Sequence, residues 1–214
     1  MTLVKSPTEL TTSATDLLLA IECLLIMIFL WQAPAFDRWR TYLWCSFFGL
    51  LAISSFFGAL AHGLDMQASR REAFFGPIFL SLGVVVVLLA AGALFDWSGR
   101  DMAKRLVWLA VPLSIILFIS GRFFKSALVI FIIYEALAFL AALAIYSFLA
   151  VTHKLDGSVF ISLAILLSLV AAGAQASPVS MKIHFPFDHN GIFHLIEMAA
   201  LALLGWGLKI GMKP

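Results

Sequence analysis

The sequence predicts an all-α protein, an integral membrane bundle of seven transmembrane helices, from three observations. The chain of 214 residues is 63% hydrophobic and only 12% charged, whereas soluble domains are about 45–50% apolar and about 25% charged. Its apolar residues form long continuous stretches and do not alternate with polar ones, which excludes a closed β-barrel. No long linker or low-complexity tract separates these stretches, so we expect a single domain over residues 1–214.

Seven stretches approach the roughly 20 apolar residues that a spanning helix needs. In chain order the predicted spans are Asp16–Trp31, Tyr42–His62, Phe74–Phe95, Leu106–Ile119, Phe124–Val151, Val159–Gln175 and Asn190–Ile210. The first span is expected to be retained in the mature protein. The polar segment before it is too long and carries too little charge to be the start of a signal peptide. The fourth is the shortest, and Pro112 should bend it. The seventh is expected to begin at Asn190, a good N-cap residue that follows Pro186.

Three histidines mark one end of this predicted bundle. His62 closes the second span, and His189 and His194 open the seventh. Because an even number of crossings separates these two points, the chain should bring all three imidazoles to the same membrane face. Polar side chains at membrane depth are costly, so such residues are functional candidates.

The histidine set predicts a zinc site, since imidazole is a common zinc ligand and three protein ligands plus water typify catalytic zinc. Residues five apart on a helix point about 140° away from each other, so His189 and His194 cannot both bind from one regular helix. A helix start at Asn190 would leave His189 free to turn inward. His184, in the loop before this span, is the rival third ligand.

Several other polar residues lie near the predicted metal level. Asp65 follows His62 by three residues, and Glu197 follows His194 by three, so Glu197 shares the helix face of that histidine. Glu22 lies within the first span, and both Glu22 and Glu197 should face the interior. Glu135 also lies within the membrane, near the middle of the fifth span. Carboxylates of this kind can orient metal ligands or move the proton of a bound water. Ser55 precedes His62 by seven residues and shares its face.

These features resemble the CREST superfamily, which contains alkaline ceramidases, the progestin and adiponectin receptor (PAQR) family and related membrane hydrolases. The resemblance rests on seven spans, a serine and a histidine at the end of span two, and paired histidines at the start of span seven. It implies a small bacterial-type member in which His62, His189 and His194 hold zinc. The chain departs from the pattern where Gly58 replaces the family serine, and where no residue cleanly matches the family aspartate.

The resulting hypothesis is a zinc-dependent intramembrane hydrolase of a lipid amide or ester that enters from the lipid bilayer. Zn²⁺ would activate water and polarise the substrate carbonyl. Asp65 is expected to serve as base or ligand orienter, Ser55 to assist the oxyanion, and Glu197 to support the metal ligands.

Two alternatives stay open on the sequence. His62 and His194 would also suit the axial positions of a haem in a membrane electron-transfer protein. A non-enzymatic lipid receptor would use zinc structurally. The sequence has no stripe of basic residues of the kind that would indicate nucleic-acid binding. Nothing in the sequence sets the oligomeric state.

Charge predicts an orientation, because basic residues are slightly more numerous at the end opposite the histidines. The positive-inside rule then places the N-terminus and the metal site on the outer face. The expected location is a bacterial inner membrane.

Overall fold

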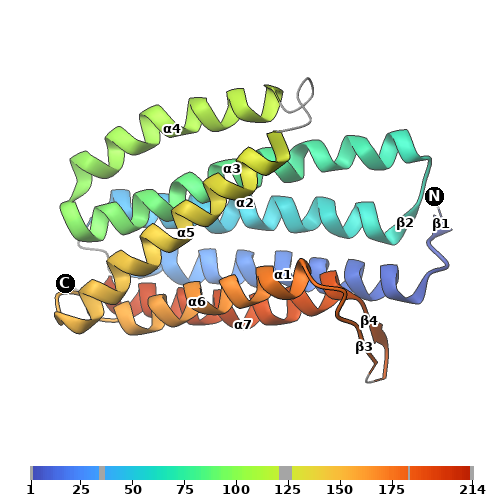
Figure 1. The fold of residues 1–214 in the computed structure, drawn as a ribbon. Helices are drawn as coiled ribbons and strands as arrows, with labels where there is room; N and C mark the ends of the chain where they lie inside the picture. The colour runs from blue at the N-terminus through green and yellow to red at the C-terminus, as the bar shows by residue number, and fades with distance from the viewer. Residues whose placement is uncertain (1, 34–36, 121–126, 183, 213–214) are drawn as a thin grey trace.

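The computed structural model describes residues 2–33, 37–120, 127–182 and 184–212, and the all-α prediction is confirmed in this part of the chain (Figure 1). All seven of its helices are long and apolar enough to cross a membrane. The helices are α1 (Pro7–Trp31), α2 (Arg38–Gly63), α3 (Ala68–Ser98), α4 (Arg100–Ser120), α5 (Ala127–Val151), α6 (Ser158–Gln175) and α7 (His189–Gly211). This architecture is consistent with an integral membrane protein.

Several helices extend beyond their apolar stretches. The predicted start of the first span at Asp16 was wrong, because α1 begins at Pro7. Likewise α3 begins at Ala68 and not at Phe74. The predicted start of the fifth span at Phe124 lies outside the described residues. The added turns are polar, which is why a search for apolar stretches leaves them out.

The helices lie side by side along one direction (Figure 1). α1 packs mainly on α2 and α7, α7 also packs on α6, and α3 packs on α2, α4 and α5. α4 occupies an outer position and buries little of its surface, and it continues through Pro112 as one helix. α1, α2 and α7, which carry the candidate site, are thus neighbours, with α1 packed on both α2 and α7.

Two short antiparallel strand pairs lie at the end of the bundle where the N-terminus is found (Figure 1). β1 (Thr2–Leu3) pairs with β2 (Leu64–Asp65), directly after α2. β3 (Met181–Lys182) pairs with β4 (Pro186–Phe187), directly before α7. The Thr11 hydroxyl donates a hydrogen bond to the Pro186 carbonyl at 2.6 Å. These pairings hold the start of α1 beside the end of α2 and the start of α7.

The opposite end is fastened by a buried ion pair. Arg40 of α2 lies 2.7 Å from Asp96 of α3, with side chains 7% and 3% exposed. Tyr146 of α5 donates to the same carboxylate at 2.9 Å, and Arg40 donates to the Gly211 carbonyl at 2.7 Å. This network joins α2, α3, α5 and the end of α7. It lies at the opposite end of the bundle from His62 and His194.

Candidate functional site

The additional turns of α1 carry the polar side chains of the candidate site. Ser6 caps the helix by accepting from the Glu9 amide at 3.4 Å, and Pro7 occupies the first turn. A serine followed three residues later by glutamate is a frequent helix start, and proline suits the first helical position. Residues three, four and seven apart share a helix face, so Glu9, Thr12 and Asp16 face the same way.

Asp16 of α1 meets His194 of α7 inside the bundle. The carboxylate Oδ1 lies 3.2 Å from the imidazole Nε2, and the two side chains are 7% and 8% exposed. His194 is thus buried, and its partner is a residue that the sequence analysis used only to mark the start of a span.

Thr15 holds the other nitrogen of the same ring. Its hydroxyl lies 2.9 Å from His194 Nδ1 and within hydrogen-bond distance of the Thr11 and Thr12 carbonyls. A hydroxyl carries one hydrogen, so it donates either to a carbonyl or to Nδ1. In either arrangement a hydrogen or a cation must lie between Nε2 and Asp16, because two bare acceptor atoms repel each other.

Gly58 of α2 makes room for the Asp16 carboxylate. A Cβ atom at this position would lie 2.8 Å from Oδ2 of Asp16 and 2.9 Å from its Cγ. The absence of a side chain therefore lets α2 lie against the carboxylate.

His62 lies in the last turn of α2 and contacts the first turn of α1. Its Nδ1 is 2.8 Å from Oε2 of Glu9, with side chains 23% and 38% exposed respectively. The pair is nearer the surface than Asp16 and His194, and an Nδ1–H donated to Glu9 leaves Nε2 of His62 as a free acceptor.

The start of α7 differs from the prediction. The helix begins at His189, and its cap is Asp188, which accepts from the Gly191 amide at 2.9 Å. The prediction of an N-cap at Asn190 was therefore wrong. Thr12 of α1 donates to the same Asp188 carboxylate at 3.0 Å. Since His189 belongs to the helix, it points about 140° away from His194.

The remaining predicted residues form no hydrogen bond or ion pair with Asp16 or His194 in the described part of the chain. Asp65 is exposed in β2, and His184 is exposed in the β3–β4 loop. Ser55 is buried in α2. Glu197 accepts a hydrogen bond from Ser168 of α6 at 3.0 Å. Among the described residues, no three side chains of His, Cys, Asp or Glu converge to hold a metal ion.

The donor chemistry nevertheless suits zinc at the Asp16–His194 pair. Ligand atoms about 2.0–2.1 Å from a tetrahedral zinc lie about 3.3 Å apart, close to the observed 3.2 Å. Zinc-binding histidines commonly engage their second ring nitrogen in a hydrogen bond, which orients the ring. Thr15 and Glu9 provide such contacts for His194 and His62. Two ligands are thus at a suitable spacing, and His62 would have to move closer.

Sequence reasoning missed Asp16 and Glu9 because both were placed before or at the edge of an apolar stretch. The Ser6-Pro7-x-Glu9 pattern was the available signal, since it predicts a helix start well before the apolar residues. Extending α1 to Pro7 would have placed Glu9, Thr12 and Asp16 on one face at the histidine end.

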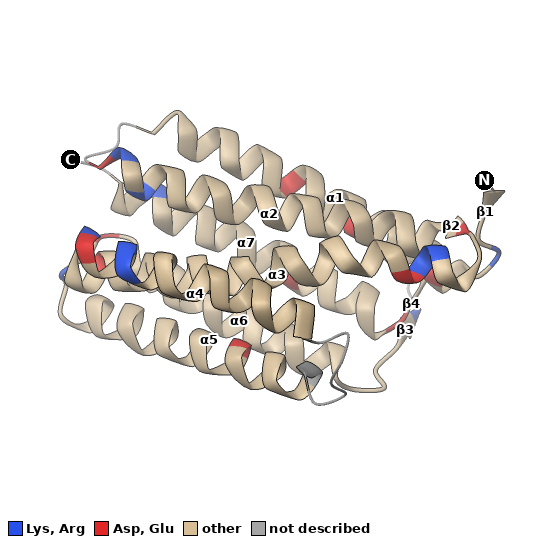
Figure 2. Cartoon of the chain, turned by 90° about the horizontal axis from the view of Figure 1, so that it is seen from above, with Lys and Arg blue, Asp and Glu red and all other residues tan. Residues whose placement is uncertain are grey.

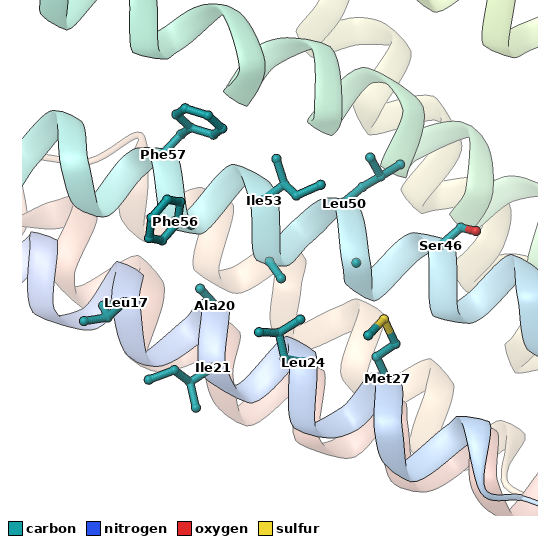
Figure 3. A pocket seen from close by; sticks show the side chains of 12 residues that line it. Leu17, Ala20, Ile21, Leu24, Met27, Ser46, Leu50, Ile53, Phe56 and Phe57 are labelled. Atoms are coloured by element: carbon teal, nitrogen blue, oxygen red, sulfur yellow. The ribbon is translucent and has the colours of Figure 1, made fainter.

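An apolar groove of about 730 Å³ lies between α1 and α2 (Figure 3). Its lining includes Leu17, which follows Asp16 in the sequence, and Phe57, which precedes Gly58. From there it continues along α1 to Met27 and along α2 to Ser46. The lining thus ends one residue from Asp16 and from Gly58 in the sequence, and neither of these two residues lines the groove.

Comparison with known proteins gives a match to one family. A sequence model described as "Family of unknown function (DUF6962)" matches residues 11–213. No curated protein and no solved structure matches the chain.

Proposed function

The chain belongs to the family of unknown function DUF6962, and we propose that it is a zinc-dependent hydrolase of a lipid amide or ester in the membrane. The observation that carries the proposal is the contact between Asp16 and His194. It joins a carboxylate and an imidazole at 3.2 Å inside an apolar bundle, where unpaired polar groups are expensive.

The proposed ligands are Asp16, His62 and His194. Asp16 takes the place that the sequence analysis gave to His189, because His189 points away from His194 on the same helix. Three protein donors leave one coordination position open, as in catalytic zinc sites. When bound, zinc would supply Lewis acidity for a substrate carbonyl group.

The surrounding residues have positioning roles in this proposal. Thr15 fixes the ring of His194, and Glu9 fixes the ring of His62. Gly58 keeps the α2 backbone close to Asp16. Glu9 is partly exposed, so it also connects the site with water outside the membrane. Asp65, also exposed at this end of α2, remains a candidate base, and Ser55 a candidate for oxyanion contact.

The proposed substrate class follows from the position of the site within an apolar bundle. The groove between α1 and α2 is lined by aliphatic and aromatic side chains apart from Ser46. Its lining ends at Leu17 and Phe57, next to Asp16 and Gly58 in the sequence, so a lipid whose polar group reaches the site would have its hydrocarbon part among apolar residues. The resemblance to the CREST superfamily points to the same substrate class.

Metal analysis of the purified full chain tests the ligand set. Wild-type protein should contain about one zinc per chain, as expected for a single open site. Asp16→Asn, His62→Ala and His194→Ala should each lose most of it. The matched control is His184→Ala, an exposed histidine at the same end of the bundle, which should retain zinc. Full zinc content in both Asp16→Asn and His194→Ala would overturn the proposed site.

Turnover separates the hydrolase from the two alternatives. Zinc-loaded protein should cleave members of a panel of lipid amides and esters, with the products measured by mass spectrometry. Zinc content without any cleavage would support a receptor with structural zinc. Iron and a Soret absorption band in the wild type, both lost in His194→Ala, would support haem instead.

A further inference from the structure

Three glutamates lie within the spans, away from the histidine end. They are Glu22 in α1, Glu135 in α5 and Glu197 in α7. Lys and Arg, by contrast, gather toward the two ends of the bundle (Figure 2). Among the described residues, none of the three glutamates forms an ion pair with a basic side chain. Their charges thus have no cationic partner in the part of the chain that the structure describes.

The contacts between α1 and α7 place Glu22 and Glu197 near the same depth. Thr15 contacts His194 at one level, and Ile26 contacts Gly205 further along, so the two helices run parallel with a constant offset. On this register Glu197 lies one helical turn, about 6 Å, nearer the histidine end than Glu22. Glutamate side chains are long enough to approach each other across that step.

The surroundings bring the two carboxyl groups into one enclosed region. Glu22 and Glu135 are close enough to Glu197 to interact with it electrostatically. Cys23, which follows Glu22 on α1, is 0% exposed. The polar contribution from α6 is Ser168, which donates to Oε1 of Glu197 at 3.0 Å.

Two carboxyl oxygens in this region have no partner. The Oε2 atoms of Glu22 and of Glu197 are shut off from the surroundings and make no hydrogen bond with the described residues. A buried carboxylate that lacks a cation or hydrogen-bond donors is strongly unfavourable, and such a group takes up a proton and becomes neutral. A neighbouring carboxylate adds repulsion, which favours the neutral form further.

The single donated hydrogen bond from Ser168 does not offset two negative charges. We therefore propose that Glu22 and Glu197 form a proton-binding site inside the membrane, in which the two carboxyl groups hold at least one proton between them at neutral pH. This site is separate from the proposed zinc ligands and does not depend on hydrolase activity.

Infrared spectroscopy of the full chain in lipid nanodiscs tests the proposal. A protonated carboxyl group has a C=O stretching band that a carboxylate lacks, and isotopic labelling of glutamate separates this band from any band of a protonated aspartic acid. Wild-type protein at neutral pH should show the glutamic acid band. Glu22→Gln and Glu197→Gln should each remove part of it, and the double variant should remove more than either. Glu72→Gln, which changes an exposed residue at the start of α3, should leave the band unchanged.

Three results would overturn the proposal. The first is a wild-type spectrum without a glutamic acid band at neutral pH. The second is a band that Glu135→Gln removes completely, since the proton would then reside on α5. The third is loss of the band on addition of sodium chloride at constant pH, which would indicate a sodium site. The wild-type spectrum decides the first point even if a variant fails to fold.

Discussion

Oδ1 of Asp16 lies 3.2 Å from Nε2 of His194, and each side chain is less than a tenth exposed. The contact joins the first and last helices of the chain, and Thr15 and Gly58 fix its two members from neighbouring positions. Removing one member would leave the other buried without a partner, which is costly in an apolar interior. The pair is therefore the natural centre for testing both stability and metal binding.

Gly58→Ala should destabilise the protein by about 1–3 kcal/mol, the usual cost of overpacking. The new methyl group would lie 2.8 Å from Oδ2 of Asp16, so the carboxylate or α2 must move. Gly49→Ala in the same helix is the matched control, because its methyl group meets only Met27 Sδ at 3.6 Å. Thermal unfolding in detergent measures both. Equal unfolding temperatures for the two variants would show that α2 does not pack tightly on Asp16.

Thr15→Val should weaken zinc binding by about 10–100-fold, as is typical when a residue that orients a metal ligand is lost. The hydroxyl contacts His194 Nδ1 at 2.9 Å, and valine keeps its shape but not its hydrogen bond. Thr15→Ser should restore most of the affinity. Competition with a zinc chelator measures the three proteins. Unchanged affinity in the valine variant would show that Thr15 does not position the ring.

The sequence predicted the number and order of the helices because the apolar interior of each span dominates its composition. It did not predict where α1 begins, since residues 7–15 are polar and belong to the helix through their cap and their contacts with α2 and α7. Ser13 illustrates this, because it donates to the Ala59 carbonyl at 2.8 Å. Such contacts depend on distant parts of the chain and leave no apolar pattern.

The site was predicted only in part, because some of its contacts also join distant parts of the chain. The even number of crossings between His62 and His194 predicted that both lie at one end of the bundle. In the structure both contact the N-terminal part of α1. The choice of partners failed, because Asp16, which lies about two and a half turns inside α1, was taken for a boundary residue. The helix start at His189 depends on Asp188, whose carboxylate also accepts from Thr12 across the bundle.

His189→Ala should change zinc content much less than Asp16→Asn. His189 is the first residue of α7, and five residues of regular helix turn it about 140° away from His194. Asp16 already lies at a ligand spacing from that histidine. Metal analysis of the two variants side by side provides the measurement. If His189→Ala loses zinc and Asp16→Asn retains it, the third ligand comes from α7 and the first turn of this helix must rearrange on binding.

Asp96→Asn should destabilise the bundle by about 3–5 kcal/mol, because it leaves the buried Arg40 without its counter-ion. The two side chains are 2.7 Å apart and almost fully enclosed. The double variant Arg40→Met/Asp96→Leu should recover much of the loss, since apolar replacements remove both charges together. Tyr146→Phe should cost only about 0.5–1.5 kcal/mol, the value of one hydrogen bond.

Thermal unfolding compares the four proteins, and zinc content should stay at the wild-type level in each folded variant because the network lies at the opposite end of the helices. A double variant as unstable as Asp96→Asn would show that α2 and α3 need the ion pair itself and not merely the absence of an unpaired charge.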